Sequence, residues 1–325
     1  MSEAPTALVS VVIPTYHRPD DLRRAVMSLL AQELPDGTDM EVLIGLSDAA
    51  AADDRAMAEE LAQADSRVRF ATAGRLGPAA ARNAALSLAR GEALAFLDDD
   101  CEAQPGWLAV GLGALDDADI VQGRTEPLGV PGYYDHAIRV EALSWLWETC
   151  NLFVRRAAAD RAGSFDEDWN PTGRPGDHWG EDAVWAWEVV RRGARIAFAP
   201  DALVLHANKP RDYSSWLRYV ATQRYYPLLI RRAPEVRQRL YKGYFLSRRH
   251  VTLTAATSLL ALGLVARTAG QPIPAYGMLA LATLGYLSPL TRGAGLELFR
   301  NQLPKDVIEF SAAIYGSIRY RRVVL

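Results

Sequence analysis

The chain has 325 residues, enough for one large hydrophobic core or two smaller ones. Its formal net charge of −3 and pI near 6.0 argue against a protein that coats nucleic acid, because such proteins carry a strong basic excess. Two cysteines, Cys101 and Cys150, are too few for a disulfide framework, so we expect reduced thiols in a cytosolic compartment. The N-terminal stretch MSEAPTALVS lacks the basic-then-apolar pattern of a secretory signal, so we expect the protein to face the cytoplasm.

Apolar β-branched runs alternate with helical patterns over the first hundred residues. Strands are predicted over residues 7–14, 40–46, 66–72 and 92–97. One helix is predicted behind Pro19, and another from Pro78 to Arg90 with Gly91 as its C-cap. Strands that alternate with helices predict a parallel α/β sheet whose ligands bind at the carboxyl ends of the strands.

Polar stretches follow three of these strands. They read PTYHR, SDAA and DDD, the last being Asp98–Asp100. Taken alone, DDD fits either a solvated turn or a site for a hard cation that carries phosphate. No GxGxxG or P-loop glycine cradle follows the first strand, so Mg²⁺ or Mn²⁺ bound by carboxylates is the expected way to hold a diphosphate. Tyr16 offers a ring for a nucleobase, and Arg18 and Arg82 are candidates for the phosphates.

Longer segments carry a family resemblance over about residues 8–210. VSVVIPTYHRPDDLRRAVMSLLAQ, GPAAARNAALSLARGEALAFLDDD, NLFVRRAAADRAGSFDED and GEDAVWAWEVVRRGARIAFAPDALVLH together resemble the family 2 glycosyltransferases of the GT-A fold. The resemblance implies a Rossmann-like nucleotide-binding sheet joined to an acceptor half. It also implies a nucleoside diphosphate sugar donor, UDP- or GDP-linked, and a metal cofactor, Mn²⁺ or Mg²⁺.

The resemblance also implies roles for particular residues. The nucleotide pocket would be lined by Pro14, Thr15, Tyr16 and Arg18, with Arg82 and Asn83 beside it. In the aspartate motif, Asp98 would face the ribose, Asp99 would also belong to the nucleotide site, and Asp100 would bind the metal, which His206 can approach. The acceptor-side acidic motif would be Glu181 and Asp182, with Asp182 as the catalytic base.

The second strand departs from the family pattern. Family members usually end it with two adjacent acidic or amide residues, whereas this chain reads IGLSDAAAADD. Asp48 takes that role, or Asp53 or Asp54 does, or other contacts hold the base. The departure leaves the nucleobase open.

The proposed chemistry needs a cation and a base. A cation at Asp100 would stabilise charge on the leaving diphosphate, and Asp182 would remove the proton of the acceptor hydroxyl. Because Asp182 opens a helical stretch, we expect the helix N-terminus to keep its carboxylate ionised. Five tryptophans crowd the expected acceptor region and either stack on sugar or pack in the core: Trp145, Trp147, Trp179, Trp185 and Trp187.

The character of the chain changes after about residue 212. Residues 224–249 are strongly basic, and two uncharged runs follow over 251–266 and 268–291. We expect a GT-A domain over 1–212, a basic amphipathic helical connector over 213–250, and an apolar helical pair with a basic tail over 251–325. The pair is either a membrane hairpin or interfacial pair, or two helices of an ordinary core.

Two classes of function remain. The favoured one is an inverting, metal-dependent glycosyltransferase at the cytoplasmic membrane face, acting on a hydroxyl or phosphate of a lipid-linked or polyprenyl phosphate envelope acceptor, with no nucleic-acid partner. The alternative is a non-catalytic sugar-nucleotide-binding scaffold subunit. A soluble nucleotidyltransferase would leave GED, residues 180–182, and the basic apolar tail unexplained.

Overall fold

The computed structural model describes residues 7–47, 52–173, 179–268 and 296–325. The chain divides into two compact units, Met1–Pro210 and Arg211–Leu325. Asp48 lies outside the described residues, so its expected role stays a prediction.

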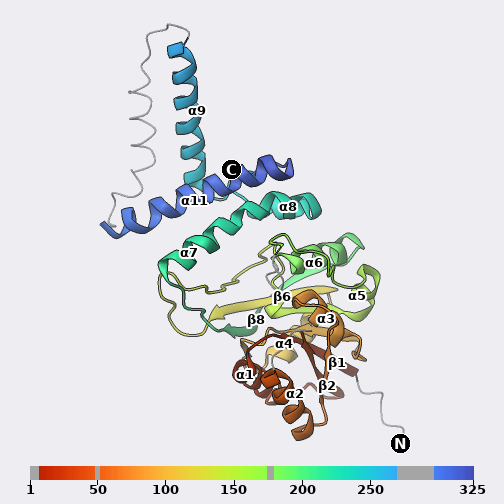
Figure 1. Ribbon diagram of the computed structural model, residues 1–325. Coiled ribbons are helices and arrows are strands. Elements are labelled where there is room, and N and C mark those ends of the chain that lie inside the picture. The colour runs from red at the N-terminus through yellow and green to blue at the C-terminus, as the bar shows by residue number, and fades with distance from the viewer. Residues whose placement is uncertain (1–6, 48–51, 174–178, 269–295) are drawn as a thin grey trace, which may run out of the picture. The chain divides into compact units, whose positions relative to one another are not determined.

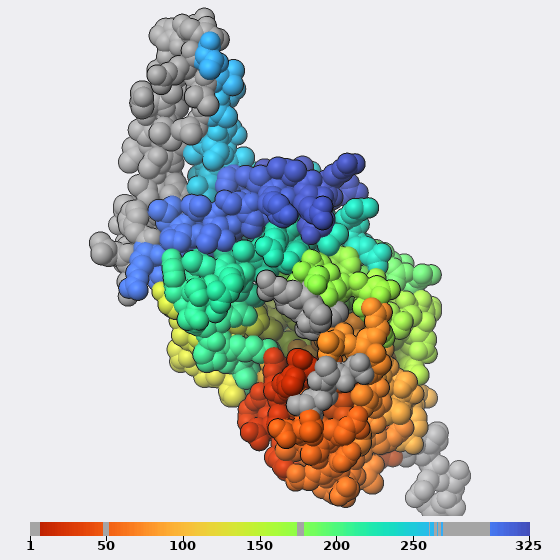
Figure 2. All heavy atoms as spheres, viewed as in Figure 1, coloured from red at the N-terminus to blue at the C-terminus, as the bar shows by residue number. Residues whose placement is uncertain are grey.

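An eight-stranded sheet organises the first unit, in the order β3-β2-β1-β4-β7-β6-β8-β5 (Figure 1). Its strands are β1 (Ala7–Thr15), β2 (Thr38–Leu46), β3 (Val68–Thr72), β4 (Ala93–Phe96), β5 (Cys101–Ala103), β6 (Ile120–Pro127), β7 (Leu152–Arg155) and β8 (Ile196–His206). In Figure 2, the red-to-orange atoms of the first part of this unit pack against the yellow-to-green atoms of its second part.

Strand direction differs between the two halves of this sheet. Strand β1 runs parallel to β2 and β4, and β2 runs parallel to β3, as predicted. Strand β7 is antiparallel to both β4 and β6, and β5 is antiparallel to β8. The parallel sheet predicted from the first hundred residues is therefore confirmed, and the eight-stranded sheet as a whole is mixed. In the second half, β5 follows a turn and β7 follows a short 3-10 helix (Thr149–Asn151), and both pair antiparallel with their neighbours. Strands β6 and β8, which each follow an α-helix, pair parallel with each other.

Helices cover both faces of the parallel half. On one face, Val9, Val11 and Ile13 share a core with α1 (Pro19–Leu30), α2 (Ala52–Ala64) and α4 (Trp107–Ala114). On the other face, α3 (Pro78–Leu86) packs on β1 and β2. A Cβ on Gly45 would lie 1.9 Å from the carbonyl oxygen of Ala81, so only glycine allows this approach.

The end of α3 corrects one expectation. The helix ends at Leu86 instead of continuing to Arg90, so Gly91 is not its C-cap. A Cβ on Gly91 would lie 2.6 Å from the backbone nitrogen of Ser10. The glycine therefore serves a close approach to β1.

The remaining helices of the first unit are α5 (Arg156–Ala162) and α6 (Glu181–Arg191). Gly180 precedes α6 with a φ of +78°, in the left-handed region that glycine enters without strain. This turn places the predicted acidic motif on the first turn of α6.

The second unit is helical in its described part. It contains α7 (Tyr213–Val220), α8 (Tyr226–Arg232), α9 (Arg248–Thr268), α11 (Leu296–Tyr320) and two 3-10 helices, Ala221–Tyr225 and Pro234–Arg239. The first apolar run lies within α9, and the second, over 268–291, falls almost wholly outside the described residues. Among the described residues, no helix combines the length and apolar character that crossing a membrane requires. The subdivision at residues 250 and 251 stays a prediction.

Candidate functional site

The three aspartates occupy the turn between β4 and β5. Asp99 and Asp100 are 4% and 5% exposed, so their charges must be compensated by neighbours. The antiparallel register pairs Cys101 with His206 at the end of β8. This pairing brings His206, more than a hundred residues away in sequence, beside Asp100.

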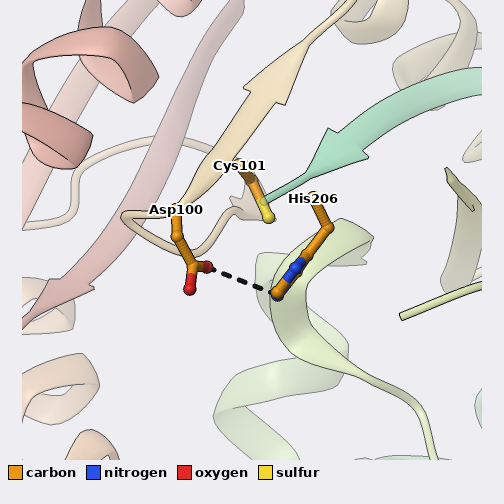
Figure 3. Close-up of side chains that lie close together, drawn as sticks. All are labelled: Asp100, Cys101 and His206. Carbon is orange, nitrogen blue, oxygen red and sulfur yellow. Dashed lines mark ion pairs between the residues drawn. The ribbon is translucent and has the colours of Figure 1, made fainter. Parts of the chain in front are cut away.

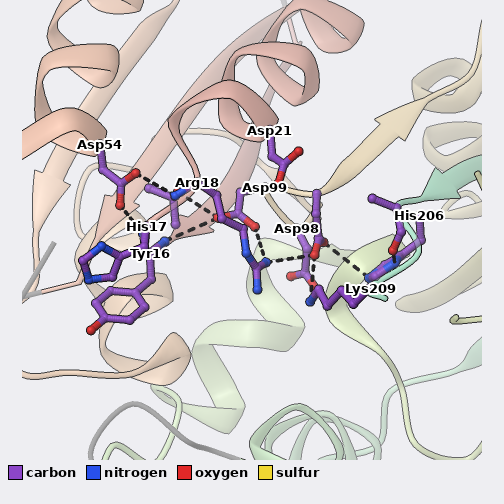
Figure 4. A network of polar contacts seen from close by, with 12 residues as sticks. Tyr16, His17, Arg18, Asp21, Asp54, Asp98, Asp99, His206 and Lys209 are labelled. Carbon is purple, nitrogen blue, oxygen red and sulfur yellow. Dashed lines mark hydrogen bonds and ion pairs between the residues drawn. The ribbon is translucent and has the colours of Figure 1, made fainter. Parts of the chain in front are cut away.

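Asp99 holds the loop that follows β1 (Figure 4). Its carboxylate accepts from the Thr15 hydroxyl at 2.8 Å, from the Tyr16 amide at 3.4 Å and from the Arg18 guanidinium at 2.9 Å. Burial raises the pKa of Asp99 to about 7, with Arg18 opposing the rise. Pro14 pairs in register with Gly45 at the end of β1, so strand pairing fixes the near side of the loop.

Asp54 holds the other side of the same loop. Its fully buried carboxylate accepts from the amides of His17 and of Arg18, the latter at 2.8 Å. The loop leaves the Tyr16 ring 41% exposed, as a stacking platform for a nucleobase requires. Asp54 was one of three alternatives for the missing acidic pair of the second strand, and the structure gives it the task of fixing the loop backbone.

Asp100 lies among three basic side chains. One carboxylate oxygen is 2.8 Å from Arg18 Nη1 and 2.8 Å from Lys209 Nζ, and the other is 3.3 Å from His206 Nε2. Burial by itself would raise the pKa of Asp100, but His206, Lys209 and Arg18 together lower it. The carboxylate is therefore ionised at neutral pH.

The donor set at Asp100 fits a divalent cation. Within the described residues, Oδ1 of Asp100 is buried without a hydrogen-bond partner, and it points at His206 (Figure 3). A ligand atom from each of Asp100, Cys101 and His206 lies within 4.8 Å of the others. Burial raises the pKa of the Cys101 thiol well above its usual range, so this sulfur stays protonated and is unsuited to a hard cation. Carboxylate and imidazole remain, a pair that suits Mn²⁺.

Arg82 joins the aspartate turn to the acidic motif of α6. One guanidinium nitrogen is 3.1 Å from Asp98 Oδ1, and the other is 2.9 Å from Glu181 Oε1. Arg82 is 4% exposed, and its two terminal nitrogens bridge the two carboxylates. Asn83 holds the backbone of Phe165 through two hydrogen bonds, of 3.0 and 2.9 Å. The expected placement of Arg82 and Asn83 beside a nucleotide stays a prediction.

Asp182 differs from the expectation in its ionisation. Its carboxylate accepts from the Ala183 amide at 2.8 Å, as a residue at a helix start can. Burial, then the charges of Glu181 and Glu148, raise the pKa of Asp182 well above its usual range, and Arg82 only partly opposes them. The expectation that the helix N-terminus keeps this carboxylate readily ionised is therefore wrong. A raised pKa is what a proton acceptor near neutral pH requires.

A loop over residues 144–148 faces this motif. Glu148 accepts from Gln122 at 2.8 Å and from the Ser144 hydroxyl, and its charge acts on Asp182. Trp145 and Trp147 both have positive φ, +62° and +57°, in a region that bulky residues rarely occupy. Such strain persists only where the surroundings fix it.

The five tryptophans expected either to stack on sugar or to pack in the core differ in burial. Trp147, Trp185 and Trp187 are buried, which is the core role. Trp145 is half-buried, and its ring stacks on that of Trp187 at 6.0 Å between centroids and 7° between planes. Trp179 contributes its carbonyl, which accepts from the Trp169 indole at 2.9 Å.

Two residues of the site were missed in the sequence. Lys209 follows His206 by three residues, but a single lysine in a loop gives no signal until the sheet places it at Asp100. Glu148 sits in a tryptophan-rich stretch with no recognisable motif, and only the fold brings it to Asp182.

The family comparison covers the nucleotide half. Residues 10–166 match the sequence model of glycosyl transferase family 2. The pre-mycofactocin glycosyltransferase of Mycobacterium tuberculosis is 28% identical over 179 residues, which cover 48% of this chain and 35% of that protein. The chain thus spans about a third of the length of that relative. The succinoglycan biosynthesis protein ExoM of Rhizobium meliloti is 29% identical over 252 residues, 72% of this chain and 79% of that protein.

A solved structure shares the fold. The mannosyltransferase PcManGT of Pyrobaculum calidifontis, in complex with GDP-Man and Mn²⁺, superposes with a TM-score of 0.61 over 98% of this chain and 88% of its own, at 18% identity. At that identity the likeness establishes the fold, which is the GT-A type.

Proposed function

The chain belongs to glycosyltransferase family 2, and from this premise we propose that it transfers a sugar from a nucleoside diphosphate to an envelope acceptor, with inversion. The observation that carries the proposal is the Arg82 bridge, because it joins the aspartate turn and the acidic motif of α6 in one site. A protein that only bound a nucleotide would need the first of these acidic groups and not the second.

The donor side is formed by the loop that Asp99 and Asp54 fix. In our proposal the exposed ring of Tyr16 stacks on the nucleobase, and Asp98, whose carboxylate is only partly buried, accepts from the ribose. Arg18, from this loop, and Lys209, from the segment after β8, both contact Asp100 and are available to the diphosphate. UDP- and GDP-linked sugars are the donor classes to test; GDP-Man is the donor bound in PcManGT.

Asp100 and His206 would hold the divalent cation, Mn²⁺ or Mg²⁺. Bound there, it would supply Lewis-acid stabilisation of the charge that develops on the departing diphosphate. Lys209 and Arg18 now pair with Asp100, and in the presence of a diphosphate these two cations can turn toward its oxygens.

Asp182 is the proposed base. Its raised pKa suits removal of a proton from an acceptor hydroxyl as the oxygen attacks the sugar, on the face opposite the leaving diphosphate. Attack from that face inverts the anomeric configuration. Glu181 pairs with Arg82 at 2.9 Å and positions the bridge. The exposed part of Trp145 offers a face for an acceptor sugar ring.

We further propose that the second unit associates with the cytoplasmic face of the membrane, where a lipid-linked or polyprenyl phosphate acceptor is found. Leu262 and Val265 of α9 are 63% and 65% exposed, and the helix follows a basic stretch. Anionic headgroups add about 1 kcal/mol for each nearby basic residue. Flotation with vesicles of phosphatidylglycerol should carry the full chain upward, whereas Leu262→Glu should stay below. Val130→Glu, at an apolar residue 98% exposed in the first unit, is the matched control.

Release of nucleoside diphosphate from a panel of UDP- and GDP-linked sugars tests the central proposal. The full chain with Mn²⁺ and a polyprenyl phosphate or lipid-linked saccharide should consume one donor class, and Asp182→Asn should lose that turnover. The anomeric configuration of the product reads inversion directly. Donor binding without turnover under every acceptor condition would favour the scaffold alternative.

A further inference from the structure

A second buried cluster of metal-ligating side chains lies in the helical unit, outside the site described above. It consists of His250 in the first turn of α9 and of Asp306 and Glu309 on α11. Asp306 and Glu309 are three residues apart, so they lie on one face of α11. One ligand atom from each of the three lies within 4.8 Å of the others. Figure 1 shows the start of α9 meeting α11, with the rest of α9 projecting away.

His250 is the observation that points to a ligand. The side chain is 0% exposed, and within the described part of the chain neither ring nitrogen has a hydrogen-bond partner. Its Nε2 points at Glu309 Oε2 but is 3.6 Å away, beyond hydrogen-bond distance. A buried polar group left without a partner typically costs about 1–3 kcal/mol, so an imidazole in this position calls for an explanation.

The imidazole of His250 is a chemically suitable metal ligand. Neutral imidazole has a lone pair on one nitrogen, which is the form that binds a metal ion.

Neighbouring side chains already contact both carboxylates. Arg249 Nε is 2.7 Å from Asp306 Oδ2, and Lys305 Nζ is 3.0 Å from Glu309 Oε1. Gln302 donates to Asp306 Oδ1 at 2.6 Å. The side chains of Arg249 and Lys305 are 33% and 29% exposed, so both can turn toward water, whereas His250 cannot. Glu309 Oε2, which faces the imidazole, is the oxygen nearest an incoming ion.

We propose that His250, Asp306 and Glu309 bind a transition-metal ion of the Zn²⁺ or Mn²⁺ class that fastens α9 to α11. One imidazole and two carboxylates suit these ions better than Mg²⁺ or Ca²⁺, which prefer oxygen alone. Bonds of about 2.1 Å to a common ion place ligand atoms about 3.4 Å apart in a tetrahedral site, so the three groups need to move inward by only a small amount. The ion would satisfy the buried imidazole and would stabilise the folded unit.

Metal stoichiometry of the full-length protein tests the proposal without any assay of sugar transfer. The His206→Gln variant, stripped with chelator and desalted, removes the contribution of the first site. Titrated with Zn²⁺ in a calorimeter, it should bind one equivalent and gain thermal stability as the free ion rises. Adding His250→Gln should abolish that equivalent. Lys305→Gln is the matched control, because it removes a neighbouring charge but no ligand, and it should retain the ion.

The rival explanation is an ion pair between protonated His250 and Glu309. It predicts no bound Zn²⁺ in His206→Gln and a stability independent of the metal, and either result overturns the proposal. Glu309→Gln provides a second test if His250→Gln does not fold, because it keeps the side-chain shape while weakening the ligand. Failure of sugar transfer would leave these outcomes unchanged, since no readout depends on it.

Discussion

The guanidinium of Arg82 lies 2.9 Å from the carboxylate of Glu181, ninety-nine residues further along the chain. The same side chain reaches Asp98 at 3.1 Å, so a single buried cation compensates an acid from each of two motifs. Removing it would leave two carboxylates facing each other beside Asp182, whose pKa is already raised. The distance between the aspartate turn and the first turn of α6 therefore depends on this bridge.

Replacing Arg82 should affect both halves of the reaction. Arg82→Lys keeps the charge, but a single ammonium group cannot reach both carboxylates as the two guanidinium nitrogens do. We therefore expect turnover to fall by about 10-fold or more. Arg82→Gln should cost about 3 kcal/mol of unfolding free energy, because the buried carboxylates lose their partner. Steady-state kinetics and urea unfolding measure the two effects. Arg23→Gln, at an exposed pair with Glu60, is the control and should change neither.

Substitution of the proposed base should separate chemistry from donor binding. Asp182→Asn should reduce turnover by about 10²-fold or more and leave the donor dissociation constant nearly unchanged, because the base acts on the acceptor. With a phosphate acceptor, already ionised at neutral pH, no base is needed, and a modest rate loss with a raised acceptor KM is expected instead. Unchanged kinetics with both acceptor classes would contradict a role for Asp182.

The raised pKa of Asp182 predicts an acid limb in the pH profile with a hydroxyl acceptor. The base acts only when ionised, so turnover should fall as the pH drops through a midpoint above 3.8, the ordinary value for an aspartate. Burial and Glu181 set this direction. Turnover measured across the acidic range, with folding checked by circular dichroism, tests it. A profile that stays flat down to pH 3.8 would show that Asp182 is not the titrating base.

Glu41 predicts acid sensitivity of the fold itself. This strand residue is 2% exposed and accepts from the Ser10 hydroxyl at 2.7 Å and the Arg90 amide at 2.7 Å. Burial would raise its pKa, but these bonds and the Arg90 charge lower it below 4.5. A lowered folded-state pKa stabilises the protein above the unfolded value, and that stabilisation is lost as the pH falls through the folded value.

Glu41→Gln should therefore lower the free energy of unfolding by about 2 kcal/mol near neutral pH, with a smaller difference from the unchanged chain in acid. Urea unfolding at several pH values measures both. Glu60→Gln, at an exposed glutamate paired with Arg23, should show neither effect.

The tryptophans give a test of the proposed acceptor face. Trp145→Leu should raise the acceptor KM with little effect on donor binding, because its half-buried ring, which stacks on Trp187, is the face we propose for an acceptor sugar. Trp185→Leu should act on stability, since this ring is 3% exposed and stacks on Phe165 at 4.4 Å. A stability loss alone in Trp145→Leu would assign that ring to the core.

Local patterns predicted the parallel half of the fold, because runs such as ALVSVVIP carry the signature of a strand buried on both faces. The short antiparallel strands gave little signal: β5 has three residues and β7 has four, too few for a period to appear. The end of α3 was misjudged because Gly91 resembles a cap, whereas its actual constraint is contact with β1.

The candidate site divides in the same way. Asp98–Asp100 and the residues of the loop after β1 could be predicted, because each group lies at the end of a strand. The end of a strand can be recognised in the sequence as the end of an apolar run. Asp54, Glu148 and Lys209 owe their positions to tertiary packing, and no local pattern distinguishes them from other charged residues. The ionisation of Asp182 was misjudged for the same reason, since a helix start is visible in sequence and burial is not.

Metal-dependent binding of a nucleoside diphosphate at Asp100 tests the account most directly. Calorimetric titration of the His250→Gln protein with UDP and with GDP, in Mn²⁺ and then in excess chelator, isolates the site in the first unit. We predict that one nucleotide binds at least about 10-fold more tightly with Mn²⁺, and that Asp100→Asn removes this difference while Asp119→Asn, at a surface aspartate paired with Arg195, retains it. Equal affinity with and without Mn²⁺, or an undiminished metal effect in Asp100→Asn, would contradict the assignment of the aspartate turn.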